Sequence, residues 1–135
     1  MYLFDTDVLS HVLKMRRSAV LMDRLEKTPP AVQFTSAVNV AEVYFGVLRK
    51  EGREDLLRGY EEQVFPRVTI LPFDLASARV FGRIKADLER QGLPRFETDL
   101  QIAAVALANN LTLVSGNIRH YGGIPGLRVE DWFAQ

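Results

Sequence analysis

The sequence of 135 residues contains no cysteine, only two histidines, and no apolar run approaching the ~20 residues of a membrane span. Without cysteine the chain can form neither disulfides nor thiolate zinc sites. His11 and His120 lie far apart and lack the spacing of a zinc site, so we interpret both as surface residues. Residues 1–5 lack the features of a secretory signal, and we therefore expect a cytoplasmic protein that does not enter a membrane.

The sequence also lacks an excess of either charge, because 17 basic residues balance 17 acidic ones. Any contact with nucleic acid must then come from a local basic surface. The sequence has no glycine-rich phosphate loop, dinucleotide fingerprint or nucleophile elbow, which argues against three large enzyme classes. Hydrophobic residues make up 47% and charged residues 25%, as expected for one globular domain spanning residues 1–135.

Short apolar runs alternate with helical patterns along the whole chain. The predicted strands are residues 2–4, 32–34, 68–71, 112–114 and 127–129. The predicted helices are residues 36–50, 75–91 and 98–109, with shorter ones at 8–14, 19–26 and 53–62. This alternation predicts an α/β fold, a three-layer α/β/α sandwich around a central, mostly parallel sheet.

Asp5 directly follows the first predicted strand. Open α/β folds place their chemistry beyond the carboxyl ends of the strands, so a carboxylate at this position is a candidate site residue. The alternative interpretation is a helix N-cap, which stabilises a helix by roughly 1 kcal/mol. Thr6 and Asp7 are equally suited to capping, which leaves Asp5 less necessary for that purpose.

Glu42 lies inside an apolar helical pattern, where a charge needs a reason. It falls beside a predicted apolar stripe formed by Val38, Ala41, Phe45 and Leu48. A solvated helix edge is the alternative interpretation. Gly46 lies one turn further on, and glycine inside a helix costs about 1 kcal/mol relative to alanine, which suggests that another group approaches the backbone there.

Asp99 is the third such acid. Thr98 and Gln101 match a capping box, and an acid in the first turn also complements the helix dipole. Asp99 nevertheless heads a stripe that we expect to face the core, formed by Ile102, Ala103 and Ala106. The strand at 112–114 should deliver residues 115–117 to the same edge of the sheet.

Several carboxylates in one cleft repel each other, by roughly 4 kcal/mol per pair at 4 Å with a dielectric near 20. A positive charge must offset this repulsion. Oxygen ligands select hard cations such as Mg²⁺ or Mn²⁺, which also bind phosphate oxygens. The three acids therefore predict metal-dependent phosphate chemistry.

Four segments match one protein family in order and spacing. They are Asp5-Thr6-Asp7, Glu42 with Gly46, Asp99-Leu100-Gln101-Ile102-Ala103-Ala104 and Val114-Ser115-Gly116-Asn117. The chain resembles a PIN-domain ribonuclease over nearly its whole length, and its size is similar to that of VapC-type toxins of toxin–antitoxin pairs. The resemblance implies a PIN-like fold and an endoribonuclease that hydrolyses RNA phosphodiester bonds with Mg²⁺ or Mn²⁺ held by Asp5, Glu42 and Asp99.

The family often has a fourth acid where Asn117 stands in this chain. The resemblance places Asn117 among the catalytic residues, and Glu97 or Asp7 could supply the missing charge. Thr6 and Ser115 match positions whose hydroxyl groups support the acids. The candidate contacts to the RNA backbone are Lys14, Arg16 and Arg17.

The resemblance also implies a homodimer and a cognate antitoxin whose tail occupies the cleft. A basic antitoxin side chain among the acids would neutralise their repulsion and displace the metal. Two alternatives remain open at the level of sequence. One is a haloacid-dehalogenase-type phosphatase with Asp5 as the nucleophile, and the other is a catalytically inactive PIN-like binding domain.

Overall fold

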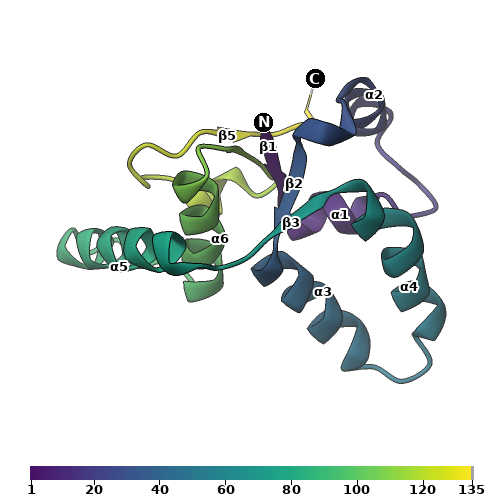
Figure 1. Ribbon diagram of the computed structural model, residues 1–135, viewed down its shortest axis with the longest axis horizontal. Coiled ribbons are helices and arrows are strands. Elements are labelled where there is room, and N and C mark those ends of the chain that lie inside the picture. The colour runs from purple at the N-terminus through teal and green to yellow at the C-terminus, as the bar shows by residue number, and fades with distance from the viewer. Residues whose placement is uncertain (135) are drawn as a thin grey trace.

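The computed structural model describes residues 1–134, which form a five-stranded parallel sheet with helices on both faces (Figure 1). The strands are β1 (Tyr2–Phe4), β2 (Gln33–Ser36), β3 (Thr69–Leu71), β4 (Thr112–Val114) and β5 (Val129–Glu130). Their order is β3-β2-β1-β4-β5, and every neighbouring pair is parallel. The predicted α/β class and parallel sheet are confirmed, with strand ends that differ by one or two residues.

The helices lie in the chain segments that connect the first four strands in sequence order. They are α1 (Thr6–His11), α2 (Ala19–Lys27), α3 (Ala37–Leu48), α4 (Glu54–Gly59), α5 (Leu75–Arg90) and α6 (Glu97–Ala108). Single turns follow at η1 (Pro30–Val32), η2 (Tyr60–Val64), η3 (Phe65–Arg67) and η4 (Ile118–Tyr121). The predicted helix at 53–62 is thus α4 continued by the π-helical turn η2.

The sheet separates two hydrophobic cores. Successive strand residues point to opposite faces, so Leu3 packs with α5 and α6 whereas Phe4 packs with α1 and α2. Trp132 is 1% exposed and completes the second core through edge contacts with Tyr2 and Phe4, at ring-centroid distances of 4.8 and 5.5 Å. None of the helices in the described residues is long and apolar enough to cross a membrane.

Helix α3 contradicts the predicted apolar stripe. Phe45 and Leu48 are 68% and 65% exposed, and the buried positions are Asn39, Val43 and Val47. The reason is visible in Figure 1, where α3 runs away from the edge of the sheet and covers neither face. Among the described residues no group of this chain approaches Gly46, because a β-carbon built there meets no atom within 4 Å.

The N-terminus of α6 also differs from its prediction. The helix begins at Glu97 after Phe96, and no side chain caps it, so Thr98 and Gln101 do not form a capping box. A capping box does exist at α3, where Ser36 and Asn39 bond reciprocally. The predicted core stripe of α6 is confirmed, since Ile102, Ala103 and Ala106 are at most 1% exposed.

Candidate active site

Three adjacent strands end in polar residues at the same edge of the sheet. Asp5 follows β1, Ser36 ends β2 and Ser115 follows β4. Strands β1, β2 and β4 are parallel neighbours, so these residues meet at the carboxyl edge. Asp5 also caps α1, because its carboxylate accepts the Thr6 amide. The capping role and a role in the site are therefore compatible for Asp5.

The Asp5 carboxylate is buried and accepts four hydrogen bonds. Oδ1 accepts from the Thr6 amide at 2.9 Å and from Asn39 Nδ2 at 3.1 Å. Oδ2 accepts from the Ser115 hydroxyl at 2.8 Å and the Tyr121 hydroxyl at 2.9 Å. Burial and the charge of Asp5 raise the pKa of Tyr121 well above its ordinary value, so its hydroxyl stays protonated and donates. The orientation of Asp5 is thus fixed from both sides.

Asn39 connects Asp5 with Glu42. The Asn39 amide donates to both Asp5 and Thr6 Oγ1, and the Thr6 hydroxyl donates to Glu42 Oε1 at 2.5 Å. The Ser36 hydroxyl in turn donates to Asn39 Oδ1 at 2.6 Å. The sequence interpretation missed Asn39, although the Ser36-x-x-Asn39 spacing is a capping-box signal one turn before Glu42.

Asp7 lies beside the loop that follows β4. Its Oδ2 accepts from the Gly116 amide at 2.8 Å and from the Asn117 side chain at 3.4 Å, whereas its buried Oδ1 has no partner. Burial, followed by the charge of Asp5, raises the pKa of Asp7 to about 6. A β-carbon at Gly116 would lie 2.9 Å from Asp7 Oδ2 and 3.1 Å from the Phe133 ring, so only glycine fits here without a shift.

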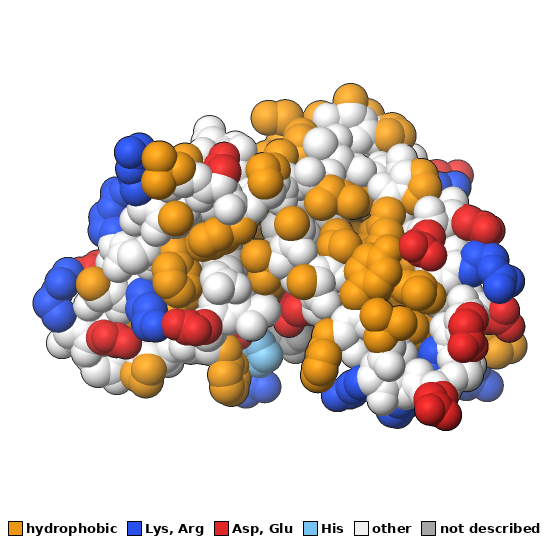
Figure 2. All heavy atoms as spheres, turned by 60° about the horizontal axis from the view of Figure 1, so that its bottom comes forward, with side chains coloured by type: hydrophobic (Ala, Val, Ile, Leu, Met, Phe, Trp, Pro, Cys, Tyr) orange, Lys and Arg blue, Asp and Glu red, His pale blue; other side chains and the backbone are white. Residues whose placement is uncertain are grey.

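Glu42 and Asp99 complete what we call the acidic cluster, defined as Asp5, Asp7, Glu42 and Asp99. Burial is the main cause that raises the pKa of Glu42 and of Asp99, and the charge of Asp5 raises both further. His120 Nδ1 lies 3.5 Å from Asp99 Oδ2 and acts in the opposite direction. Figure 2 shows acidic side chains and a histidine in the hollow between two lobes that carry apolar surface.

Not every predicted residue joins this cluster. Glu97 is exposed and forms an ion pair with Lys85 of α5, so it does not supply the missing fourth charge. Asn117 contacts the cluster through Asp7. The three basic residues proposed for RNA follow the far end of α1, opposite Asp5, and all are exposed: Lys14, Arg16 and Arg17.

The spacing of the acidic side chains limits how they could hold a metal ion. Among residues 1–134, no three His, Asp or Glu side chains stand close enough together to share one ion directly. Within the same residues, His120 is the one basic side chain that pairs with the acidic cluster, so most of its negative charge is not balanced. An oxygen donor set with excess charge and spaced ligands fits a hydrated hard cation such as Mg²⁺, which keeps several of its waters.

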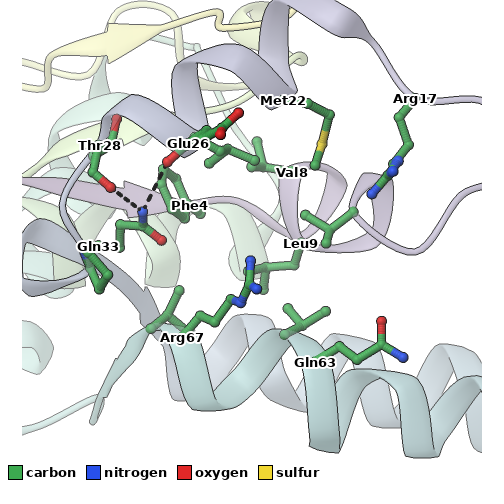
Figure 3. A pocket seen from close by; sticks show the side chains of 15 residues that line it. Phe4, Val8, Leu9, Arg17, Met22, Glu26, Thr28, Gln33, Gln63 and Arg67 are labelled. Atoms are coloured by element: carbon green, nitrogen blue, oxygen red, sulfur yellow. Dashed lines mark hydrogen bonds between the residues drawn. The ribbon is translucent and has the colours of Figure 1, made fainter.

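A larger hollow lies elsewhere on the molecule. This cavity of about 690 Å³ lies between α1, α2 and the η2–η3 turns, and no member of the acidic cluster lines it. Figure 3 shows Val8, Leu9 and Met22 around it, with Arg17 and Arg67 at its sides. The two hollows therefore differ in chemistry: one is acidic, and the other is mainly apolar with Arg17, Arg67 and Glu26 among its lining residues.

Comparison with known proteins agrees with this architecture. A family model described as PIN domain matches residues 2–121. The chain is 35% identical over 131 residues to "Ribonuclease VapC2" of Haemophilus influenzae and 30% identical over 131 residues to "tRNA(fMet)-specific endonuclease VapC" of Shigella flexneri, in each case covering 97% of both proteins. The crystal structure of VapBC2 from Rickettsia felis bound to a promoter DNA fragment superimposes with a TM-score of 0.88 and 26% identity, over 97% of this chain and 98% of that one.

These matches cover the strands and helices that carry Asp5, Glu42 and Asp99. They also argue against the phosphatase alternative, since the matched family is a ribonuclease family. The chain belongs to the PIN-domain family and, within it, to the VapC ribonucleases of toxin–antitoxin systems.

Proposed function

We propose that this protein is a divalent-metal-dependent endoribonuclease whose acidic cluster is the active site. The observation that carries the proposal is Asp5, a buried carboxylate held by four donors at the carboxyl edge of the sheet and surrounded by three further acids. Family membership supports the reaction class.

Each residue has a distinct task in this proposal. Asp5, Glu42 and Asp99 would hold Mg²⁺ or Mn²⁺, which supplies charge stabilisation and an activated water for phosphodiester hydrolysis when bound. Asn39 and Tyr121 keep Asp5 in place, and Thr6 orients Glu42.

Asp7 and Asn117 hold the loop after β4 against α1, through the Gly116 amide and the Asn117 side chain. Asn117 carries no charge, and the exposed Glu97 is paired with Lys85. The site therefore has one acid fewer than a fully acidic set, which favours a single ion that keeps several of its waters.

Cleavage of a purified RNA mixture with and without Mg²⁺ or Mn²⁺ tests the proposal. The wild type should cleave only with metal, and Asp5→Asn should not cleave with either ion. Asp87→Asn is the matched control, because Asp87 forms an ion pair with Arg90 on α5 outside the site. Metal-independent cleavage, or full activity of Asp5→Asn, would contradict the proposal. An unreactive wild type would favour the inactive binding domain.

We further propose a cognate antitoxin as partner, because the chain belongs to the VapC ribonucleases of toxin–antitoxin systems. The apolar cavity with Arg17 and Arg67 at its border suits an amphipathic segment with acidic side chains. A basic side chain of the same partner would balance the acidic cluster. Met22→Glu should then weaken co-purification with the antitoxin while RNA cleavage by the free protein stays unchanged.

The exposed apolar face of α3 supports a second protein contact. Phe45 and Leu48 are more than half exposed on one side of this helix, a surface that monomers seldom leave uncovered. We propose that this chain forms a homodimer, and sedimentation velocity of wild type and Leu48→Glu would test it. A monomeric wild type would contradict it.

A further inference from the structure

A small pocket adjoins the acidic cluster on the side of Asp99. It has a volume of about 400 Å³ and is lined by Pro94, Arg95, Phe96, Asp99, Arg119 and His120. We call it the Phe96 pocket. Asp99 belongs to both the cluster and the pocket, so a chain that occupied the cleft would pass directly from one to the other.

Phe96 gives the pocket an aromatic wall. It immediately precedes α6 and is 76% exposed, more than any other phenylalanine of the described chain. No aromatic partner lies within stacking distance of it among residues 1–134. An exposed phenylalanine is a stacking platform for an unpaired base, since every base presents a π-face.

Arg119 and His120 give the pocket a basic wall. Within the described residues, the Arg119 side chain makes no ion pair and no hydrogen bond, so its guanidinium is free to bind a phosphate. His120 is half exposed and already faces Asp99. Arg119 places positive charge beside an otherwise acidic cleft, where a nucleic-acid backbone would need it.

Arg95 makes the pocket rigid. Its guanidinium donates to the carbonyl oxygens of Leu93 and Pro94 at 3.3 and 3.1 Å, and to that of Gly122 at 2.7 Å. The loop before α6 is thereby tied to the end of η4, across 27 residues of sequence. The aromatic and basic walls are therefore held at a fixed spacing before any ligand binds.

We propose that the Phe96 pocket binds one nucleotide of single-stranded RNA next to the scissile phosphate, with its base on Phe96 and a phosphate at Arg119. This inference rests on the proposed function, because it takes RNA as the substrate. The pocket has the volume of a small-ligand site and shares Asp99 with the acidic cluster, whereas a protein interface needs a much broader surface.

Binding of a short fluorescein-labelled single-stranded RNA to the Asp5→Asn protein, measured by anisotropy in EDTA, tests the pocket without cleavage. Adding Phe96→Ala should weaken binding about 5- to 100-fold, the effect of losing one stacked base. Phe96→Trp should retain the affinity, and Phe96→Leu should not. Leu75→Ala is the matched control, because Leu75 is an exposed apolar residue outside the pocket and this variant should bind like the parent.

The basic wall predicts an effect on the salt dependence of RNA binding. Arg119→Ala should weaken binding and lower the slope of log affinity against log salt by about 1, as for one lost phosphate contact. Arg79→Ala, on the exposed side of α5, should leave the slope unchanged. Thermal unfolding of each variant should match the parent, because these side chains are exposed.

Two outcomes would overturn the proposal. One is parental RNA affinity in Phe96→Ala or Phe96→Leu. The other is a changed sedimentation coefficient of Phe96→Ala with unchanged RNA affinity, which would make the pocket a protein contact. Failure of the proposed function would give a different result. The wild type would then not cleave RNA in the presence of metal, regardless of the effect of Phe96→Ala on RNA affinity. If cleavage depends on Asp5 and metal while Phe96→Ala binds RNA with the parental affinity, the proposed function is supported and the proposed role of the Phe96 pocket is wrong.

Discussion

Asp5 and Asp99 belong to the same acidic cluster, yet their surroundings are opposite. Asp5 is 6% exposed and each of its oxygens accepts two hydrogen bonds from the protein. Asp99 lies at the rim, and among the described residues His120 is the one side chain within ion-pair distance of it. The inner acid is fixed in place, whereas the outer acid keeps free lone pairs. This difference indicates that the inner residues set the geometry of the site and the outer acids supply its unbalanced charge.

The sharpest test of this comparison is to neutralise the outer acid. Asp99→Asn should lower metal-dependent RNA cleavage by at least about 100-fold, since a ligand is lost. It should also raise the stability of the metal-free protein near neutral pH, because burial and the charge of Asp5 raise the pKa of Asp99 and so disfavour its ionised form on folding. Chemical denaturation in EDTA measures the second effect, and a destabilised Asp99→Asn would contradict it.

Substitution of an inner residue should lower the stability of the protein, whereas substitution of the outer acid should raise it. Asn39 is fully buried and bonds Ser36, Asp5 and Thr6 at once. Asn39→Ala should therefore lower the free energy of unfolding by about 2–3 kcal/mol, because it leaves buried polar groups without partners. Asn109→Ala is the control, since Asn109 is exposed and bonds only a backbone carbonyl. Equal losses in the two variants would contradict the assignment of Asn39 to a rigid inner network.

Asp7 provides a pH-dependent test. The pKa of Asp7 is raised to about 6 from an ordinary value of 3.8, so its ionised form is disfavoured in the folded protein. The folded state is therefore penalised as pH rises through this interval, and the penalty is absent at lower pH. Asp7→Asn should gain about 1–2 kcal/mol of stability near pH 8, after allowing for partial exposure, and nothing near pH 3.

Denaturation curves of Asp7→Asn across this pH range measure the effect. Asp23→Asn is the control, since Asp23 forms an exposed i,i+4 ion pair with Lys27. A pH-independent difference between wild type and Asp7→Asn would show that the charge of Asp7 is not the cause.

The smallest expected effect is that of the Tyr121 hydroxyl. Tyr121→Phe removes one donor to Asp5 while the buried ring keeps its packing. We expect a loss of about 1 kcal/mol, the typical net contribution of one hydrogen bond, because Asp5 keeps its three other donors. Tyr44→Phe is the control, because the Tyr44 hydroxyl bonds Glu61 at the surface. Identical stability of the two variants would indicate that Asp5 does not depend on its fourth donor.

The same contrast explains what the sequence could predict. Asp5 and Asp99 were found because each follows a local rule, a carboxylate after a buried strand and an acid heading the core-facing stripe of α6. Both rules depend on positions close in the chain. The parallel sheet then brings Ser115 beside Asp5, as the strand pattern predicts.

The errors arose where tertiary structure overrides a local pattern. An apolar stripe normally faces a core, but α3 extends past the edge of the sheet, so Phe45 is exposed and the polar Asn39 is buried. Tyr121 reaches Asp5 from 116 residues away through the η4 turn, and no periodicity indicates such a contact. The apolar periodicity of α6 is real, but its start at Glu97 has no side-chain cap to detect.

The central claim is that the acidic cluster binds a divalent ion and that this binding requires Asp5. Calorimetric titration of the metal-free protein with Mn²⁺ tests it most directly. The wild type and Asp87→Asn should bind the ion with the same affinity, and Asp5→Asn should show no saturable binding although it remains folded. Wild-type affinity for Mn²⁺ in folded Asp5→Asn would contradict the account.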